Sequence, residues 1–363
     1  MQSIQTLPRW RRVLQSNWLY LAVLVFLIVF PHLVGWITGD SPFGVGGRPR
    51  GQSVFWQSVF IEVFILTILT MSYNLIFGFT GVISFGHALF FGLGGYILGL
   101  VLQMTDLGPE IGLVVGGVIG VIVCGLLGFL MGLVSLRLRG VYFAIFTLAI
   151  AEMFFIYIGR WPLTNAEDGF ALNNIPELLN STRNRLTYYY VALVLVILTF
   201  LFIRRLINSP TGKVLLAIRE NENRAQAIGY NTLTFKLVAI TLAGMMAAGA
   251  GMLHVILNKK VGPETLGLTY TVDPLLMTII GGVGTHAGPI IGTAGLHLSE
   301  RVFNREFIIG STTINIGQNW SLILGIVFIV VVLVFPQGVV GTWARWRQRR
   351  RAARAPTESG RSG

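Results

Sequence analysis

Few of the side chains that could do chemistry lie inside the long apolar runs of this sequence. Glu62, His87 and Glu152 fall within such runs, and Asp273 lies near the start of a later one. Nucleophilic catalysis would need a base and an acid to accompany the nucleophile, and no such set stands out among the five histidines. The single cysteine, Cys124, cannot supply a disulfide framework or a metal cluster. We therefore expect no catalytic residues, no metal site and no enzyme activity.

Two glycine patterns match nucleotide-binding motifs by spacing alone. Gly282, Gly284 and Ala287 fit part of a dinucleotide fingerprint, but no alternation of strands and helices surrounds them. The pair Gly212 and Lys213 lacks the upstream glycine of a phosphate-binding loop. We therefore expect no ATP site and no other cofactor on this chain. If ATP drives its function, the ATPase is a separate subunit.

The composition is that of a membrane protein that crosses the bilayer several times. The 363 residues are 53% hydrophobic and 12% charged, with a mean hydropathy of +0.71, whereas soluble domains carry about 25% charged residues. Much of the formal charge of +12 lies near the two ends. Basic arms beside apolar spans favour anchors at an anionic membrane surface over nucleic-acid binding. We expect a cytoplasmic basic arm at 1–17, a transmembrane domain at 18–342 and a disordered basic tail at 343–363.

The predicted fold class is all-α: a polytopic transmembrane helical bundle of about 8–10 spans. Runs long enough to cross about 30 Å of hydrocarbon at about 1.5 Å per residue cover 18–37, 54–77, 85–104, 111–136, 141–159, 188–207, 235–257 and 319–342, with a broken run at 272–298. The alternative for the first run is a signal peptide, but no small-residue cleavage motif follows it. Glycines spaced by four, such as Gly95 and Gly99, predict closely packed helices.

The distribution of Lys and Arg predicts the orientation of these spans. The N-terminal arm, the turn at 137–140 and the residues Arg204, Arg205 and Lys213 all fall on one side, which we interpret as cytoplasmic. The Arg-rich C-terminus should lie on the same side, so both termini are predicted to be cytoplasmic. An even number of crossings must therefore lie between the charged segment and the C-terminus. The spans 235–257 and 319–342 supply two, so the run at 272–298 must return to the side from which it enters or cross twice.

The broken run contains the segment GGVGTHAGP, at 281–289. Five of its residues oppose a continuous helix: Gly281, Gly282, Gly284, Gly288 and Pro289. We predict a re-entrant pair of half-helices here. Backbone groups freed inside a membrane must be buried in protein or line a wet cavity.

Polar residues at bilayer depth are costly and normally face a cavity or a partner. We predict that a translocation path is lined from among Asn74, His87, Thr147, Glu152 and Asp273. The competing interpretation of His87 is a hydrogen-bonded structural residue. A proton relay would require a continuous series of acids, which the sequence lacks.

One charged segment, SPTGKVLLAIRENENRAQAIGYN at 209–231, interrupts the apolar sequence. Ser209 and Pro210 are typical of a helix start, and Gly229 is typical of a C′ stop. Four apolar positions can share one side of the helix between them: Val214, Leu215, Ile218 and Ile228. We predict one amphipathic helix over 211–228, anchored by spans at both ends. It would be a docking helix for a cytoplasmic motor, or else a solvated loop helix.

Several stretches carry a resemblance to a known family. The segment 212–239, GKVLLAIRENENRAQAIGYNTLTFKLVA, resembles the coupling segment of permease subunits in binding-protein-dependent ABC importers. Further stretches are similar to other segments of that family, in the same order: YNLIFGFTGVISFGHALFFGLGGY at 73–96, VYFAIFTLAIAEM at 141–153, GGVGTHAGPIIGTAG at 281–295 and VLVFPQGVVG at 332–341. The resemblance covers 54–341 and is greatest to the M-type subunits of the branched-chain amino acid group.

The resemblance implies a mechanism and a set of partners. The residues that would couple to the ATPases are Ile218, Arg219, Glu220, Asn221, Glu222, Arg224, Ala225 and Gly229. The implied partners are a homologous second permease, two cytoplasmic ATPase subunits that hydrolyse ATP, and an extracytoplasmic substrate-binding protein, all at a bacterial inner membrane. The implied substrate is a branched-chain or other neutral amino acid. Importers of urea and short-chain amides belong to the same family and are the alternative.

Two other classes of protein remain open on the residues alone. An ion-coupled secondary transporter could use the broken run at 272–298 as a midplane site and would work without ATP. A membrane-embedded enzyme would need a convergent reactive set. The long outer loop at 161–187 is either a plain connector or a docking surface for an outside partner.

Overall fold

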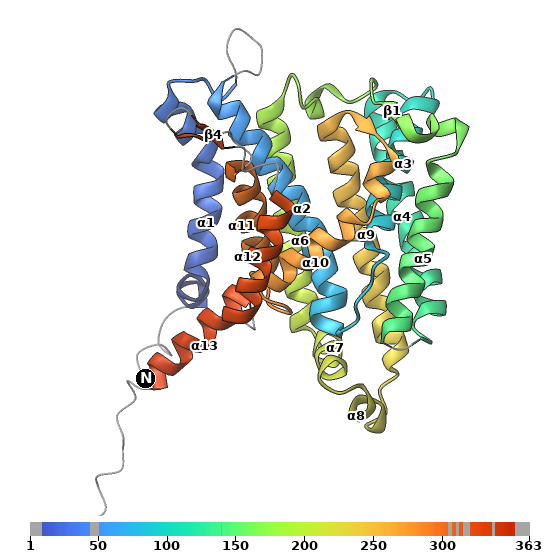
Figure 1. The fold of residues 1–363 in the computed structure, drawn as a ribbon, viewed down its shortest axis with the longest axis vertical. Helices are drawn as coiled ribbons and strands as arrows, with labels where there is room; N and C mark the ends of the chain where they lie inside the picture. Colours follow the sequence, from blue (N-terminus) through green and yellow to red (C-terminus); the bar gives the residue numbers. More distant parts are fainter. Residues whose placement is uncertain are drawn as a thin grey trace, which may run out of the picture. The chain divides into compact units, whose positions relative to one another are not determined.

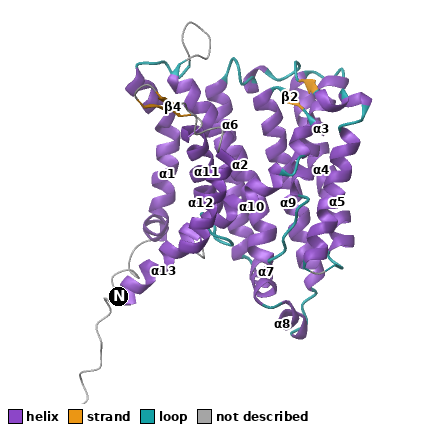
Figure 2. Ribbon diagram, in the orientation of Figure 1, coloured by secondary structure: helices purple, strands orange, loops and turns teal. Residues whose placement is uncertain are grey.

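The computed structural model describes residues 9–43, 51–138, 140–303, 307–309, 312–314, 320–335 and 338–352. This part of the chain is almost entirely helical, as Figures 1 and 2 show. Seven of its helices are long and apolar enough to cross a membrane: α1 (Arg9–Thr38), α2 (Gln52–Thr80), α3 (His87–Met104), α4 (Pro109–Ser135), α5 (Val141–Ile158), α6 (Arg185–Asn208) and α9 (Thr232–Asn258). Each coincides with a predicted span, so the predicted all-α membrane bundle is confirmed.

The chain forms two compact units, of which the smaller comprises Met1–Ile61 and Glu177–Val191. Within this unit the hydroxyl of Tyr189 donates a hydrogen bond to the carbonyl oxygen of Leu27 at 2.7 Å. The hydroxyl of Ser53 donates to the carbonyl oxygen of Pro31 at 2.9 Å. These two bonds attach α1 to the start of α2 and the start of α6.

The larger unit comprises Glu62–Pro176 and Ala192–Gly363, and its core is the packing of α3, α4 and α9, which lie side by side in Figure 1. Glycines allow the backbones to approach. A Cβ added at Gly94 of α3 would lie 2.5 Å from the backbone of Ala248 in α9, and one at Gly251 would overlap the carbonyl group of Phe91. The predicted glycines are also close to their neighbours: a Cβ at Gly95 or Gly99 would lie 2.6 Å from the side chain of Val255 or Val261. The close packing that the glycine spacing predicts is therefore present.

Two shorter helices, α10 (Thr269–Gly281) and α11 (Gly288–Phe303), form the broken run. At about 1.5 Å per residue they are about 20 Å and about 24 Å long, so neither spans a 30 Å hydrocarbon layer alone. A Cβ at Gly292 would overlap the carbonyl of Met277, and one at Gly281 would overlap that of Gly288. The two helices therefore run back along each other from the break at 282–287, as expected for a re-entrant pair.

The last predicted span, 319–342, is two helices rather than one: α12 (Trp320–Val334) and α13 (Gly338–Ala352). The chain turns at Gly338, which has a φ of +69° and donates its amide to the carbonyl of Phe335 at 2.7 Å. That φ favours glycine and ends a continuous helix. The first part of the expected tail at 343–363 lies in α13, and the rest lies outside the described residues, as do residues 1–8 of the expected arm.

Short elements lie at opposite ends of the larger unit. The helices α7 (Pro210–Glu220) and α8 (Glu222–Ala227) form what we name the coupling end. The strands β1 (Phe170–Ala171) and β2 (Lys260–Val261) pair antiparallel at the other end, the strand end (Figure 1). Beside them are 3-10 turns at Pro162–Thr164, Ala166–Asp168 and Pro263–Leu266. A second antiparallel pair, β3 (Phe307–Ile309) and β4 (Thr312–Ile314), follows α11.

Candidate functional site at the coupling end

The charged segment begins at a tight corner between α6 and α7. The side-chain oxygen of Ser209 accepts a hydrogen bond from the amide of Gly212 at 3.4 Å, and Pro210 occupies the first turn, as predicted for a helix start. A Cβ at Gly212 would overlap the backbone of Ile207 in α6. Because this corner has no room for a side chain, α7 cannot swing freely against α6.

The prediction of one continuous helix over 211–228 is wrong. The chain is extended at Asn221, with φ −160° and ψ 102°, and this residue separates α7 from α8. Its side-chain oxygen accepts a hydrogen bond from the amide of Arg224 at 2.9 Å, so it caps the second helix. Asparagine side chains compete with helical hydrogen bonds in this way, which is why they favour caps over helix interiors.

The end of α8 is the stop that the sequence predicts. Gly229 has a φ of +95°, and its amide donates to the carbonyl of Gln226 at 2.9 Å. The amide of Tyr230 donates to the carbonyl of Ala225 at 3.1 Å, which completes a Schellman motif. Ile228 was predicted to lie on the buried side of the helix, and this prediction is wrong: its side chain is 67% exposed. The break at Asn221 rotates α8 out of register with α7 and turns Ile228 outward.

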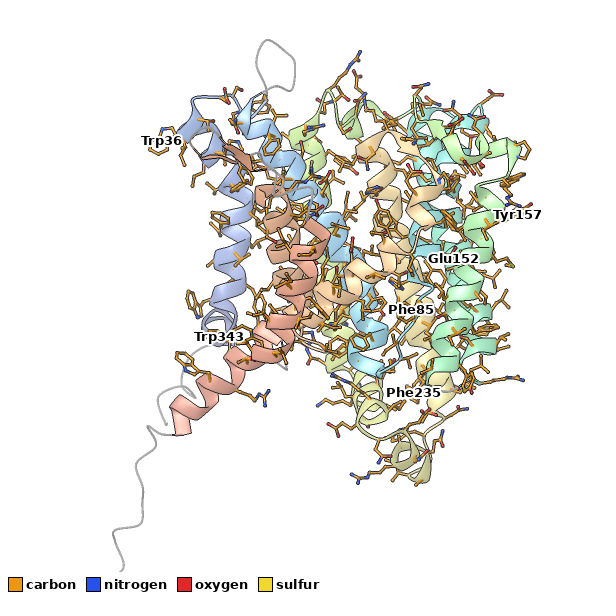
Figure 3. The ribbon with its side chains drawn as sticks, in the orientation of Figure 1. Trp36, Phe85, Glu152, Tyr157, Phe235 and Trp343 are labelled. Carbon is orange, nitrogen blue, oxygen red and sulfur yellow. The ribbon has the colours of Figure 1, made fainter. Side chains whose placement is uncertain are left out.

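The two short helices are also attached to the start of α9. Val214, Ile218 and Ala225 form a small buried cluster on which Phe235 of α9 packs; Figure 3 labels Phe235 at the coupling end of that helix. The ammonium group of Lys236 lies 2.6 Å from the carboxylate of Glu222. The coupling helices thus contact the membrane helices that precede and follow them.

A cavity of about 930 Å³ opens at the coupling end. Its walls are the segment between α2 and α3, the turn between α4 and α5, and the start of α9. Five of the eight predicted coupling residues line it: Ile218, Arg219, Glu220, Asn221 and Glu222. The other three are outside its lining, where Ala225 is buried and Arg224 and Gly229 are exposed. A large concave surface with charges of both signs can receive part of a protein partner.

The break between α10 and α11 is clasped by α2. The side-chain oxygen of Asn74 accepts a hydrogen bond from the amide of Gly284 at 2.9 Å, and its NH₂ group donates to the carbonyl of Thr285 at 3.1 Å. One turn later, a Cβ at Gly78 would lie 2.7 Å from the Gly284 nitrogen. Gly284 itself has a φ of +73°. Asn74 is therefore buried and serves as a clasp: its side chain satisfies the Gly284 amide and the Thr285 carbonyl, which the break frees from helical bonds.

The coupling helix contacts this break through Arg219. A Cβ at Gly284 would overlap the guanidinium group of Arg219, and one at Gly81 would lie 3.4 Å from its Cγ. The arginine therefore lies against two glycines, one at the break and one just after α2. Arg219 is exposed in part; its partial desolvation lowers the pKa of the guanidinium, and the charge of Glu220 opposes that shift. These contacts form one continuous path from α7 to α10, α11 and α2.

Two of the remaining path candidates, His87 and Thr147, lie near the start of α3, where a Cβ at Gly86 would lie 2.7 Å from the carbonyl oxygen of Thr147. His87 is fully buried, with its Nε2 2.8 Å from the hydroxyl of Ser72, which favours the structural interpretation. Thr147 is fully buried and accepts the amide of Phe85 at 3.1 Å. Glu152 is half-buried between the ends of α5 (Figure 3) and outside the lining of the large cavity. Asp273 is half-buried in the first turns of α10.

Sequence reasoning missed several residues of the break and of α11. The hydroxyl of Thr285 donates to the carbonyl of Gly282 at 2.8 Å and accepts the amide of Gly288 at 2.9 Å, so it caps α11. A threonine just ahead of a helix start was a usable signal. His297 and Arg301, both of which contact Glu62, were also missed. Their spacing by four, which places them on one helix face, was the signal available.

The family described as "Branched-chain amino acid transport system / permease component" matches residues 56–332, most of the chain. The chain belongs to this family. The permease is therefore a transport subunit and a multi-pass membrane protein, not an enzyme.

Curated relatives resemble the permease over about three quarters of its length. The high-affinity branched-chain amino acid transport system permease protein LivM of Salmonella typhimurium is 27% identical over 303 residues, which are 76% of this chain and 68% of the relative. LivM of Escherichia coli is 27% identical over 301 residues, with the same coverage of 76% and 68%. The "Probable branched-chain amino acid transport permease protein LivM" of Methanocaldococcus jannaschii is 23% identical over 310 residues, 75% of this chain and 89% of the relative. No solved structure matches the permease.

Proposed function

We propose that the permease is a subunit of an ABC importer that moves branched-chain amino acids across the bacterial inner membrane without altering them. ATP would be hydrolysed on two separate cytoplasmic ATPase subunits, and a binding protein would deliver the substrate at the outer face. A second, homologous permease would complete the pore. The observation that carries this proposal is the pair α7 and α8, attached to α6 at one side and to α9 at the other.

The exposed side of the coupling helices would meet the ATPase. Glu220, Arg224 and Ile228 are exposed there, and an isoleucine exposed beside charged residues fits an apolar socket on a partner protein. Ile218 and Ala225 are buried and would hold the shape of the pair. In this division, Glu220 and Arg224 would contact the ATPase, and Ile218 and Ala225 would keep the contact surface in place.

A movement of the ATPase would be transmitted to the membrane helices through Arg219. A push on α7 moves the guanidinium that lies against Gly284, and Gly284 is bonded to Asn74 of α2. Packed elements of this kind shift between discrete arrangements rather than bending smoothly. The break would therefore alternate between two packings and switch access to the path from one side of the membrane to the other.

The proposed orientation places the coupling end, and both termini, in the cytoplasm. Arg204, Arg205 and Lys213 lie near that end, in agreement with the excess of basic residues in cytoplasmic loops. The orientation is tested by a single cysteine at exposed Asn223, in a chain whose Cys124 is replaced. A membrane-impermeant maleimide should label that cysteine in inside-out vesicles but not in intact cells. Labelling in intact cells would place the coupling helices outside and refute the proposal.

The relatives' names support a branched-chain amino acid as the substrate, and importers of urea or short-chain amides are the second candidate. The decisive experiment purifies the tagged permease with its co-expressed partners and reconstitutes the complex in liposomes. Leucine uptake should require ATP and binding protein, and urea should not compete with it. Uptake by the isolated chain without ATP would instead support a secondary transporter.

A further inference from the structure

Beside the broken helix pair lies a second set of ionisable residues, which we name the α11 polar cluster: Glu62, Asp273, His297, Glu300 and Arg301. The Nε2 atom of His297 lies 3.0 Å from a carboxylate oxygen of Glu62, and its Nδ1 atom lies 3.6 Å from one of Glu300. Arg301 forms an ion pair with the same oxygen of Glu62. The cluster therefore joins α11 to α2.

Asp273 is the member of the cluster for which the described residues provide no hydrogen-bond or ion-pair partner. It lies in the first turns of α10. Met277 and Gly281 of α10 lie against Gly292 and Gly288 of α11, and the same antiparallel register places Asp273 opposite residues 296–297, beside His297. Within the part of the chain that the structure describes, its carboxylate makes no hydrogen bond and no ion pair. Three carboxylates in this cluster face one guanidinium and one imidazole, so the site has negative charge in excess. An added cation would be stabilised beside Asp273.

The cluster lies at membrane depth and is open on one side. Glu62 is about 15 Å from the Gln52 end of α2 and about 27 Å from its Thr80 end, at about 1.5 Å per residue. The side chains of Arg301 and Glu300 are nevertheless 42% and 36% exposed. Charges at this depth are not stable against lipid. The open side must therefore face water or a partner in the assembled transporter.

We propose that the α11 polar cluster binds the charged groups of the amino acid during its passage: Asp273 accepts hydrogen bonds from the α-ammonium group, and Arg301 donates to the α-carboxylate. Arg301 has five N–H donors, and its pairing with Glu62 leaves some of them for a ligand. This inference rests on the proposed function, because it assigns the place where the transported molecule is held.

The chemistry of the cluster selects a class of substrate. A zwitterion that enters a low-dielectric path needs a partner for each of its charges, and the cluster supplies one of each sign. The aliphatic side chain of such an amino acid needs no charged partner and can lie against the apolar walls of the path. Urea and short-chain amides carry no charge, so a path for them would gain nothing from an unpaired carboxylate. The cluster thus favours α-amino acids over amides.

The test compares Asp273→Asn and Asp273→Glu in the complete importer, reconstituted with its partner permease, ATPases and binding protein. We expect Asp273→Asn to lower leucine uptake by about ten- to a hundredfold, the range for loss of a charge-assisted hydrogen bond. Asp273→Glu should retain much of the uptake, because it keeps the charge. Binding-protein-stimulated ATP hydrolysis should continue in both variants. The matched control is Glu110→Gln, at an exposed carboxylate in the first turn of α4, which should transport like the wild type.

Three results would overturn the inference alone, in the presence of normal wild-type uptake. The first is uptake by Asp273→Asn within about twofold of the wild type. The second is uptake by Asp273→Glu as low as that of Asp273→Asn. The third is an equal loss of uptake and of stimulated hydrolysis in both variants. The last result would make Asp273 a structural residue. Failure of the wild-type importer to take up leucine with ATP is a different outcome, which would refute the proposed function and this inference with it.

Discussion

Replacement of Asn74 by alanine should loosen the helix break without unfolding the bundle. The variant loses two hydrogen bonds, to the amide of Gly284 and the carbonyl of Thr285, each worth about 0.5–1.5 kcal/mol. It also leaves a backbone amide unpaired, at a cost of about 1–3 kcal/mol. Because these contributions overlap, we expect local opening of residues 282–288 to become easier by about 2–4 kcal/mol.

Hydrogen–deuterium exchange of the purified permease in nanodiscs measures this opening directly. At about 1.4 kcal/mol per tenfold change, peptides that cover 282–288 should exchange about thirtyfold to about a thousandfold faster in Asn74→Ala. Peptides from α3 and α4 should not change. The matched control is Gln103→Ala, which removes an exposed amide side chain at the end of α3 and should leave exchange at the break as in the wild type. Unchanged exchange at 282–288, or an equal increase throughout the chain, would refute the clasp.

Three further predictions concern the coupling end and use the reconstituted importer, with uptake and ATP hydrolysis measured together. Asn221→Ala removes the cap on the Arg224 amide and should destabilise α8 by about 1 kcal/mol, so uptake should fall relative to hydrolysis; a constant ratio would contradict the role of the cap. Gly229→Ala places a side chain at a φ of +95°, which costs about 1–2 kcal/mol, and it should uncouple hydrolysis from uptake while membrane insertion continues; normal uptake would count against the docking role. Glu222→Lys breaks the ion pair with Lys236 and should lower uptake, and adding Lys236→Glu should restore it; a double variant as poor as the single one would mean that the pair does not attach α8 to α9.

The spans were predictable because length and apolar composition decide them almost alone. A helix such as α9 must be long and apolar to cross the bilayer, and both properties are read directly from residues 232–258. The break between α10 and α11 was equally accessible, because glycines and a proline crowd one short stretch.

The division of the coupling segment was not predictable in the same way. It depends on one side chain, that of Asn221, which can either continue a helix or cap a new one. The free-energy difference between these choices is small, and packing of Ala225 and Phe235 helps to decide it. The sequence pattern therefore placed Ile228 on the wrong side.

The α11 polar cluster could not be predicted from the sequence, because it depends on how elements distant in the chain are aligned. Glu62 and His297 are separated by 235 positions, and nothing local in either helix reveals that they meet. The spacing of His297 and Arg301 showed only that they share a face of α11. Which helix that face contacts is set by how α2 packs against the re-entrant pair, a property of the folded chain alone.

The pairing of β1 with β2 makes α9 a direct connection between the strand end and the coupling end. Residue 261 is paired with Phe170 of the outer loop, the amide of Leu172 donates to the carbonyl of Lys259 at 2.9 Å, and near the opposite terminus of α9 Lys236 binds Glu222. At about 1.5 Å per residue the helix between them is a strut of about 40 Å. If the proposed function holds, a binding protein that moves the loop at the outer surface would also move α7 and α8 at the cytoplasmic surface. Arrival of the substrate would then be signalled across the bilayer before the substrate enters it.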